Sequence, residues 1–170
     1  AILIAYWIGV FTKQVQQVNG LMMSLSLSWQ EAKKINTDCV TLAFNNSKFN
    51  TIVSGSEEAV QNVIHDLNAQ GIVSQKVDTC GAAFHSLCIK GIYNLLLQKL
   101  KTIIIEPKKR SSKWLSTFNQ SSEYLSSEYI ASMITKPVYF AQALSSVSIN
   151  AVILEIGHNS FLSEDTRNVL

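Results

Sequence analysis

The sequence contains few charged residues for its length. Asp, Glu, Lys and Arg make up 15% of its 170 residues, whereas about 25% is usual for soluble domains. Hydrophobic residues make up 47%. A chain of this length forms one modest core and needs polar side chains to cover it. The shortage of charge therefore indicates a piece cut from a larger body, with surfaces that face neighbouring domains.

Long apolar runs, a strong net charge and paired cysteines are also missing. The apolar run at residues 1–11 is shorter than the roughly 20 residues of a membrane helix, and we interpret it as a truncated buried helix. The net charge of +2 is too small to suggest a nucleic acid or a membrane as partner. The odd number of cysteines, without metal-ligand spacing, predicts reduced thiols in a cytoplasmic protein and no metal site. They are Cys39, Cys80 and Cys88.

Residues 20–79 alternate between the hydrophobic patterns of strands and helices. Ser28 and Glu31 form a capping box at the start of a short helix that ends near Ile35. Ser56 and Gly71 mark the start and stop of a second helix, whose apolar residues recur at helical spacing. Strands are expected at 21–27, 40–44, 51–54 and 72–78, with a polar turn at 45–48. The resulting β-α-β-β-α-β order is the ferredoxin-like pattern.

Residues 80–170 predict helices that alternate with apolar strands. Helices are expected at 87–101, 127–134 and from Pro137 to Phe140, and strands at 114–117 and 151–156. The last strand is apolar except at Glu155, which is typical of a strand buried on both faces. This alternation indicates the α/β class.

The segment Gly81–Ser86 contains the residue best suited to catalysis. His85 follows the strand-like run at 73–78 and precedes the next helix, which is where a fold can present an imidazole at a cleft. Histidine is the usual general base near neutral pH. A base of this kind activates a serine on a Gly-x-Ser-x-Gly turn, and the 170 residues contain no such sequence.

Several short motifs, in order, resemble the acyltransferase (malonyl/acetyl transferase) domain of animal-type fatty acid synthases over nearly the whole chain. They are Ala5–Trp7, Leu27–Trp29, Ile52–Gly55, Ala83–Ser86, Glu106–Lys108, Trp114–Thr117 and Leu154–Ile156. The resemblance implies an α/β-hydrolase-like core that carries the ferredoxin-like unit as an insert. Residues 1–19 would then be a truncated edge of the core, 20–79 the ferredoxin-like subdomain, and 80–170 the remainder of the core.

The resemblance also implies an activity and its residues. The intact domain would move an acyl group from coenzyme A to a serine, and then to the phosphopantetheine thiol of an acyl carrier protein. His85 would be the catalytic base, Phe84 would shape the acyl pocket, and a backbone carbonyl near Met133 would orient the imidazole. The serine would lie before Ala1, so this piece alone should be inactive. The expected partners are the carrier protein and neighbouring synthase domains, without a permanent cofactor, nucleic acid or membrane.

One position departs from the family pattern. The family has an arginine directly after Tyr-Trp, where it holds the free carboxylate of malonyl-CoA, and this chain has Ile8. Losing a charge-assisted pair costs roughly 2 kcal/mol or more. We therefore expect the complete domain to prefer acetyl-type over malonyl-type substrates.

The sequence also raises three other interpretations. A degenerate, non-catalytic acyltransferase-like domain with a structural or interaction role is made more plausible by Ile8. An RNA-binding module built on the ferredoxin-like unit is disfavoured, because Thr51–Ser54 lacks the aromatic residues that stack on bases. The basic cluster between Lys108 and Lys113 is read as a solvated loop that could meet an acidic carrier protein.

Overall fold

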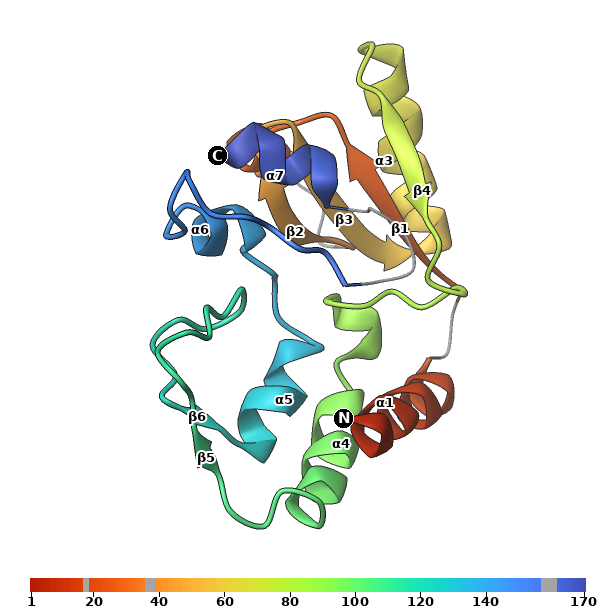
Figure 1. Ribbon diagram of the computed structural model, residues 1–170. Helices are drawn as coiled ribbons and strands as arrows, with labels where there is room; N and C mark the ends of the chain where they lie inside the picture. The colour runs from red at the N-terminus through yellow and green to blue at the C-terminus, as the bar shows by residue number, and fades with distance from the viewer. Residues whose placement is uncertain (17–18, 36–38, 157–161) are drawn as a thin grey trace.

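The computed structural model describes residues 1–16, 19–35, 39–156 and 162–170. A four-stranded sheet with its helices occupies one end of the molecule, and a group of helices and loops occupies the other (Figure 1). We call residues 20–77 the sheet unit. The helical part consists of α1 (Ile2–Val15) and the residues from η1 (Leu87–Ile89) to α5 (Ser127–Met133). The loop between β4 (Ser74–Val77) and η1 connects the two and carries His85.

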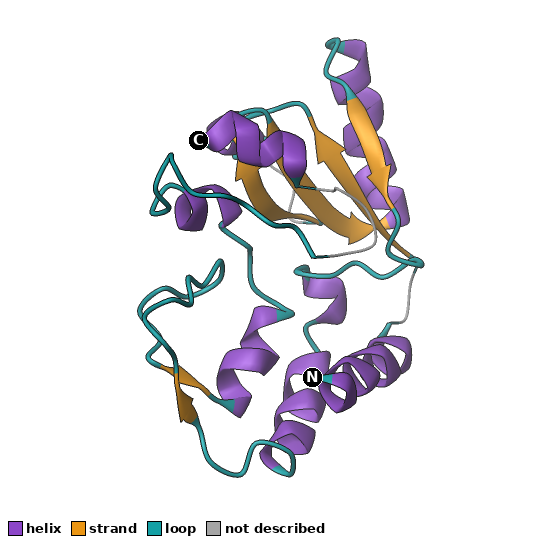
Figure 2. Ribbon diagram, in the orientation of Figure 1, coloured by secondary structure: helices purple, strands orange, loops and turns teal. Residues whose placement is uncertain are grey.

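The sheet unit contains four antiparallel strands in the order β2-β3-β1-β4. Along the chain its elements follow the order β-α-β-β-α-β. Figure 2 shows the strands in orange, with α3 along one side of the sheet. The bounds are β1 (Gly20–Leu25), α2 (Trp29–Ala32), β2 (Val40–Ser47), β3 (Asn50–Ser56), α3 (Glu57–Ala69) and β4 (Ser74–Val77).

Local sequence signals explain the two helices of the sheet unit. The Ser28 hydroxyl accepts a hydrogen bond from the Glu31 amide, and the Glu31 carboxylate accepts one from the Ser28 amide at 2.9 Å, which completes the predicted capping box. Ser56 caps α3 by accepting from the Ala59 amide. Gly71, just beyond α3, has φ +79°, a conformation that favours glycine.

The core of the sheet unit lies between α3 and one face of the sheet. It consists of Leu21, Leu25, Val53, Val60, Val63 and Leu67. The expected turn at 45–48 is wrong in part, because β2 continues to Ser47 and pairs with β3 through two register irregularities. These irregularities let a polar stretch continue the strand without placing every side chain on the core face.

The helical part is built around α4 and its neighbours. Its core contains Ile89, Ile92, Leu96 and Leu100, against which α1 and α5 pack. The further bounds are α1 (Ile2–Val15), η1 (Leu87–Ile89), α4 (Ile92–Lys101), β5 (Lys108–Lys109), β6 (Tyr124–Leu125), α5 (Ser127–Met133), α6 (Phe140–Leu144) and α7 (Ser163–Val169). The short helices α6 and α7 contact β2 of the sheet unit.

Two predictions for the helical part need correction. The expected helix at 87–101 is divided into the 3₁₀ turn η1 and the helix α4, with Gly91 between them. The expected strand at 114–117 is a loop instead. The Arg110 guanidinium donates to the carbonyls of Asn119, Ser122 and Trp114 and holds that loop. Hydrogen bonds from one side chain to several loop carbonyls leave no signal in hydrophobic periodicity.

Two apolar segments are more exposed than the sequence predicts. The expected strand at 151–156 is an extended segment without strand pairing among the described residues, and Val152, Leu154 and Ile156 are 87%, 81% and 98% exposed. A buried strand needs neighbouring strands for its backbone groups, and the described residues supply none here. The expected helix at the N-terminus forms as α1, but Ile2, Leu3 and Tyr6 remain exposed.

Candidate active site

His85 lies in a tightly turned loop between β4 and η1. Cys80, Gly81 and His85 have φ values of +51°, +78° and +60°. A positive φ is uncommon for residues other than glycine and is held only when the surroundings fix it. The Thr79 hydroxyl donates to the Ala82 carbonyl at 2.6 Å, and the Ser86 hydroxyl donates to the Ala83 carbonyl at 2.7 Å. These short-range hydrogen bonds stabilise the loop conformation in which His85 has a positive φ.

Gly20 anchors this loop to the sheet. Its amide donates to the Gly81 carbonyl at 2.8 Å. A Cβ atom at Gly20 would lie 2.5 Å from the Ala83 amide nitrogen and 2.6 Å from the Ala83 Cβ atom. No larger residue fits without moving the backbone next to His85. The first residue of β1 therefore positions the loop by its lack of a side chain.

The hydrogen bonds of His85 assign a role to each ring nitrogen. Nδ1 lies 2.7 Å from the Lys136 carbonyl oxygen, and a carbonyl can only accept, so Nδ1 donates its proton. The His85 amide also donates to the Ile134 carbonyl, at 3.1 Å. In the neutral ring Nε2 then carries the lone pair. This tautomer is the one that a general base on Nε2 requires.

The segment after α5 is tied to the sheet unit, which fixes the Lys136 carbonyl. Val138 forms a parallel bridge with Phe44: its amide donates to the Ala43 carbonyl and its carbonyl accepts from the Asn45 amide, both at 2.8 Å. The Phe44 ring meets the imidazole edge-on, with 4.7 Å between centroids. Strand β2 therefore supports His85 in two ways. The Phe44 ring contacts the imidazole, and the bridge to Val138 fixes the segment whose Lys136 carbonyl accepts from Nδ1.

Burial sets the protonation state of His85. The residue is 9% exposed, and removal from water lowers the pKa of the imidazole below its ordinary value of 6.5. Hydrogen bonding to the backbone at Lys136 and Met133 raises that pKa in part. The loss of hydration is the larger effect, so His85 is neutral near pH 7 and can accept a proton.

The other predicted site residues contact different parts of the structure. Phe84 is half-buried and packs against both the helical core and the sheet. Ile8 is half-buried on α1 and packs against the helical core. Met133 is the last residue of α5, and its backbone affects the pKa of His85. The ring nitrogen Nδ1, however, lies 2.7 Å from the carbonyl oxygen of Lys136, three residues after the predicted position.

Sequence reasoning missed Lys136 and Phe44. Lys136 acts through its main-chain carbonyl, which every residue possesses, so residue type gives no signal. Phe44 was assigned to a strand, and its contact with His85 depends on how β2 meets the segment at residues 136–138. The one available signal was the family resemblance, which placed the orienting carbonyl near Met133, three residues before Lys136.

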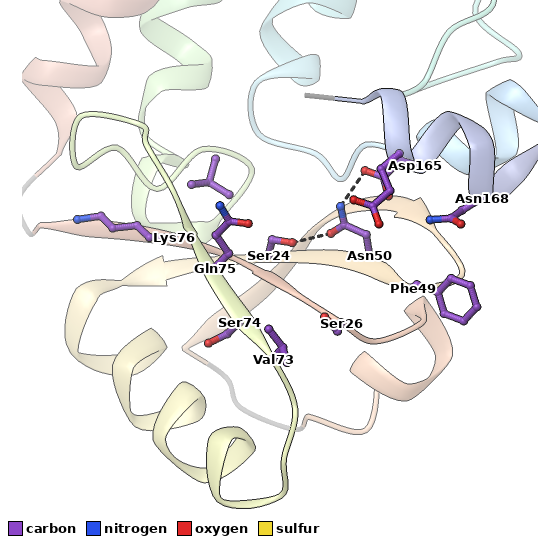
Figure 3. Close-up of a pocket in the computed structure, with 12 residues that line it drawn as sticks. Ser24, Ser26, Phe49, Asn50, Val73, Ser74, Gln75, Lys76, Asp165 and Asn168 are labelled. Carbon is purple, nitrogen blue, oxygen red and sulfur yellow. Dashed lines mark hydrogen bonds between the residues drawn. The ribbon is translucent and has the colours of Figure 1, made fainter. Parts of the chain in front are cut away.

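A second polar cluster lies on the sheet beneath α7 (Figure 3). Asp165 is 3% exposed and accepts hydrogen bonds from the Ser47 hydroxyl and the Asn50 side-chain amide, both at 2.8 Å. Asn50 in turn accepts from the Ser24 hydroxyl at 2.8 Å. Loss of hydration raises the pKa of the Asp165 carboxyl, and the two donors lower it in part. The cluster attaches α7 to β2 and β3 and does not contain His85.

The remaining polar candidates add no catalytic group. Among the described residues, no three His, Cys, Asp or Glu side chains gather as they would around a metal ion. Cys39, Cys80 and Cys88 are free thiols. His65 is exposed on α3 beside Asp66, and His158 lies outside the described residues. No described helix has both the length and the apolar character needed to cross a membrane.

Comparison with known proteins relates this geometry to one family. The family model described as "Acyl transferase domain" matches residues 1–169. The highly reducing polyketide synthase easB of Emericella nidulans is 27% identical over 190 residues, which cover 100% of this chain and 8% of that protein. The reducing polyketide synthase DEP5 of Alternaria brassicicola is 28% identical over 186 residues, which cover 99% of this chain and 8% of that protein. The chain thus spans less than a tenth of these relatives.

Solved structures show the same fold. The acyltransferase domain of phenolphthiocerol/phtiocerol synthase A from Mycobacterium bovis superimposes with a TM-score of 0.79 at 18% identity, covering 98% of this chain and 65% of that one. The malonyl CoA-acyl carrier protein transacylase of Coxiella burnetii gives a TM-score of 0.73 at 15% identity, covering 85% and 48%. Both sequence relatives are polyketide synthases, so the narrower resemblance to animal-type fatty acid synthases is not confirmed. The family model matches residues 1–169, almost the whole chain, and this chain therefore belongs to the acyl transferase domain family.

Proposed function

We propose that this chain is the base-bearing part of an acyltransferase domain in a multidomain synthase. The domain moves acetyl- or malonyl-type acyl groups from coenzyme A to the phosphopantetheine thiol of an acyl carrier protein. Among synthases that use such domains, the motifs around Trp7, Trp29 and His85 favour fatty acid synthesis. The observation that carries the proposal is the tautomer of His85: Nδ1 donates to the Lys136 carbonyl, so Nε2 carries the lone pair of the neutral ring.

The geometry suits two successive half-reactions, in each of which His85 takes up a proton and returns it. His85 Nε2 takes the proton of a serine hydroxyl as that oxygen attacks the thioester carbonyl, and returns it to the departing coenzyme A thiolate. In the second half, Nε2 takes the proton of the carrier protein's thiol and returns it to the serine oxygen. A neutral base with a pKa below 6.5 is available for each attack near pH 7.

The nucleophile is assigned to a part of the synthase outside this chain. The 170 residues contain no Gly-x-Ser-x-Gly sequence, the turn on which such a serine is presented. The chain by itself is then inactive as a transferase. Incubation with labelled acetyl-CoA tests this directly, because a stable ester formed on the 170-residue chain, and lost in His85→Ala, contradicts the assignment.

The fold supports a division into an insert and a core. The sheet unit has the element order and strand order of a ferredoxin-like subdomain, and we propose that it is the insert of an α/β-hydrolase-like core. Residues 1–19 and 80–170 then belong to that core. The exposed apolar segment at 151–156 supports this division, because a segment that is apolar on both faces becomes stable as a strand once neighbours pair with it.

The proposed partners and location follow from the same family. The acyl carrier protein and the neighbouring synthase domains are the partners, and the domain uses no permanent cofactor. We place the synthase in the cytoplasm, where the free thiols of Cys39, Cys80 and Cys88 are stable.

Ile8 supports a preference for uncharged acyl groups. Its side chain packs against the apolar cluster of α4 and brings no charge to the position where the family has an arginine. A malonyl carboxylate finds no guanidinium there, whereas an acetyl group needs none. The complete domain should show a higher kcat/KM for acetyl-CoA than for malonyl-CoA. An equal or reversed ratio means that another cation binds the carboxylate.

The decisive experiment uses the complete domain with its serine. Transfer of labelled acetyl groups from coenzyme A to the carrier protein should fall by about 10²- to 10⁴-fold in His85→Ala. His65→Ala is the matched control, since His65 is exposed on α3, and should leave the rate unchanged. Equal rates in both variants would remove His85 from the mechanism.

A non-catalytic domain is the second candidate, favoured by the loss of the arginine at position 8. It predicts that the complete domain, with serine and His85 intact, forms no acyl-enzyme with acetyl-CoA or malonyl-CoA. Detection of an acyl-enzyme excludes this candidate.

A further inference from the structure

A cavity next to His85 is lined by positive and hydrogen-bonding side chains. It lies between the start of α4 and the end of α5, and we call it the lysine pocket. The residues of the lysine pocket used below are Ser86, Lys90, Asn94, Ser132, Thr135 and Lys136. The pocket is distinct from the cluster around Asp165, with which it shares no lining residue.

The charges of the lysine pocket are one-sided. Lys90 and Lys136 come from different segments, and no acidic residue lines the cavity. In the part of the chain that the structure describes, the salt bridges are His65–Asp66 and Lys101–Glu128, so neither pocket lysine has a carboxylate partner. Both lysines are exposed and able to meet a ligand. The pocket therefore favours an anion.

Two other side chains suit an anion with several oxygen atoms. Ser132 carries a hydroxyl group, and Asn94, in the first turn of the ten-residue helix α4, carries an amide. The hydroxyls of Thr135 and Ser86 already donate to the main-chain carbonyls of Ser132 and Ala83. The positive end of the α4 dipole points toward the same region. Two ammonium groups together with two neutral donors match a phosphate ester better than a single carboxylate.

The position of the lysine pocket relates it to the reaction. Ser86 directly follows His85, and the main chain of Lys136 holds His85 Nδ1 at 2.7 Å. The pocket extends from these two residues past Lys90, which precedes α4, to Asn94 in the first turn of that helix. A ligand can thus place an anion among the lysines while a flexible arm leads back to the base.

We propose that the lysine pocket holds a phosphate ester of a pantetheine-type thioester, with Lys90 and Lys136 as its cations. This inference rests on the proposed acyl transfer at His85 and adds a second point of attachment for the substrate. Coenzyme A and the carrier protein's prosthetic group both carry a phosphate on the pantetheine arm, and coenzyme A carries further phosphates at its nucleotide end. The site binds that shared phosphate chemistry.

The test is equilibrium binding to the 170-residue chain, measured by calorimetry with coenzyme A and with pantetheine, which lacks phosphate. Coenzyme A should bind more tightly. The double variant Lys90→Gln with Lys136→Gln should weaken coenzyme A binding by roughly tenfold, because two charge-assisted contacts are lost, and leave pantetheine binding unchanged. Lys33→Gln, an exposed lysine after α2, is the matched control. The Lys136 substitution keeps the carbonyl that holds His85, and circular dichroism checks the fold.

Two more probes identify which phosphate is bound. If the double variant loses affinity only for 4′-phosphopantetheine, the pocket binds the pantetheine phosphate. If it loses affinity only for adenosine 3′,5′-bisphosphate, the pocket binds the nucleotide end. Either result supports the proposal. Equal coenzyme A affinity in the wild-type chain and the double variant overturns it, as does an equal loss for pantetheine. The assay involves no chemistry, so a negative result leaves the transfer role of His85 standing. Conversely, inactivity of the complete domain leaves lysine-dependent binding intact.

Discussion

The sheet unit and the helical part differ in how completely they bury their apolar side chains. In the sheet unit, the large exposed apolar residues among those described are Phe49 and Val73. Outside it, α1 exposes Ile2, Leu3 and Tyr6, and further large apolar side chains are exposed from Leu87 to Ile156. The sheet unit therefore buries most of its large apolar side chains in its own core, whereas the rest of the chain presents apolar surface for contact with other protein.

This difference explains where the catalytic base lies. His85 is held from both sides: Gly20 and Phe44 belong to the sheet unit, and Lys136 belongs to the segment after α5. A residue between the two parts can be held by the sheet unit and still face the apolar surface that the rest of the chain leaves uncovered. If this is so, substitutions in the sheet unit and outside it should differ in their effects.

The largest expected effect comes from the core of the sheet unit. Leu25→Ala removes a fully buried side chain and should lower the free energy of unfolding by about 2–5 kcal/mol. Leu154→Ala changes a side chain that is 81% exposed and should change that free energy by at most about 0.5 kcal/mol. Urea denaturation measures both. Similar losses in the two variants would show that residues 151–156 are part of the core in solution.

The junction should respond next. Gly20→Ala places a methyl group 2.5 Å from the Ala83 amide and should destabilise the protein by about 1–3 kcal/mol, because the backbone must move. Gly9→Ala is the control: it has nothing within 4 Å of the new Cβ atom, lies in α1, and should stabilise by about 0.5–1 kcal/mol. If Gly20→Ala is as stable as the wild type, the loop does not depend on β1.

His85 should make the stability depend on pH. Its pKa is lowered in the folded protein, so below pH 6.5 the unfolded chain binds a proton that the folded chain excludes. Stability should fall as the pH drops from 6.5 through the folded-state pKa. His85→Gln should flatten the curve in this window and His65→Gln should not. An unchanged slope in His85→Gln would mean that the ring is not shielded from water.

The smallest effect is expected at the capping box of α2. Ser28→Ala removes the side-chain acceptor of the Glu31 amide and should destabilise by about 0.5–1 kcal/mol. Ser28→Asp keeps an acceptor and should recover most of that loss. Equal stability of the alanine variant would show that this four-residue helix is held by packing alone.

Prediction from sequence worked where the determining interactions are local. The capping box at Ser28, the stop at Gly71 and the apolar stripe of α3 each depend on residues a few positions apart, and the structure contains all three. The extended segment at 151–156 shows the limit of such patterns. Its composition predicts a buried strand, but a strand forms only when other strands pair with it.

The candidate site follows the same rule. His85 could be proposed because its motif and its place after a strand are written in the sequence. Its environment could not be predicted, because Lys136 contributes a carbonyl and Phe44 contributes a ring that a parallel bridge at Val138 brings into contact. Contacts of this kind depend on the assembled fold.

The tautomer and pKa of His85 test the central claim most directly. Nitrogen-15 NMR titration of the imidazole, assigned by comparison with His85→Gln, reports which ring nitrogen carries the proton and at what pH the second proton binds. The structure predicts a proton on Nδ1, a free Nε2, and a pKa below the ordinary value of 6.5. A ring protonated on Nε2 in its neutral form, or a pKa above 6.5, would contradict the assignment of His85 as the base.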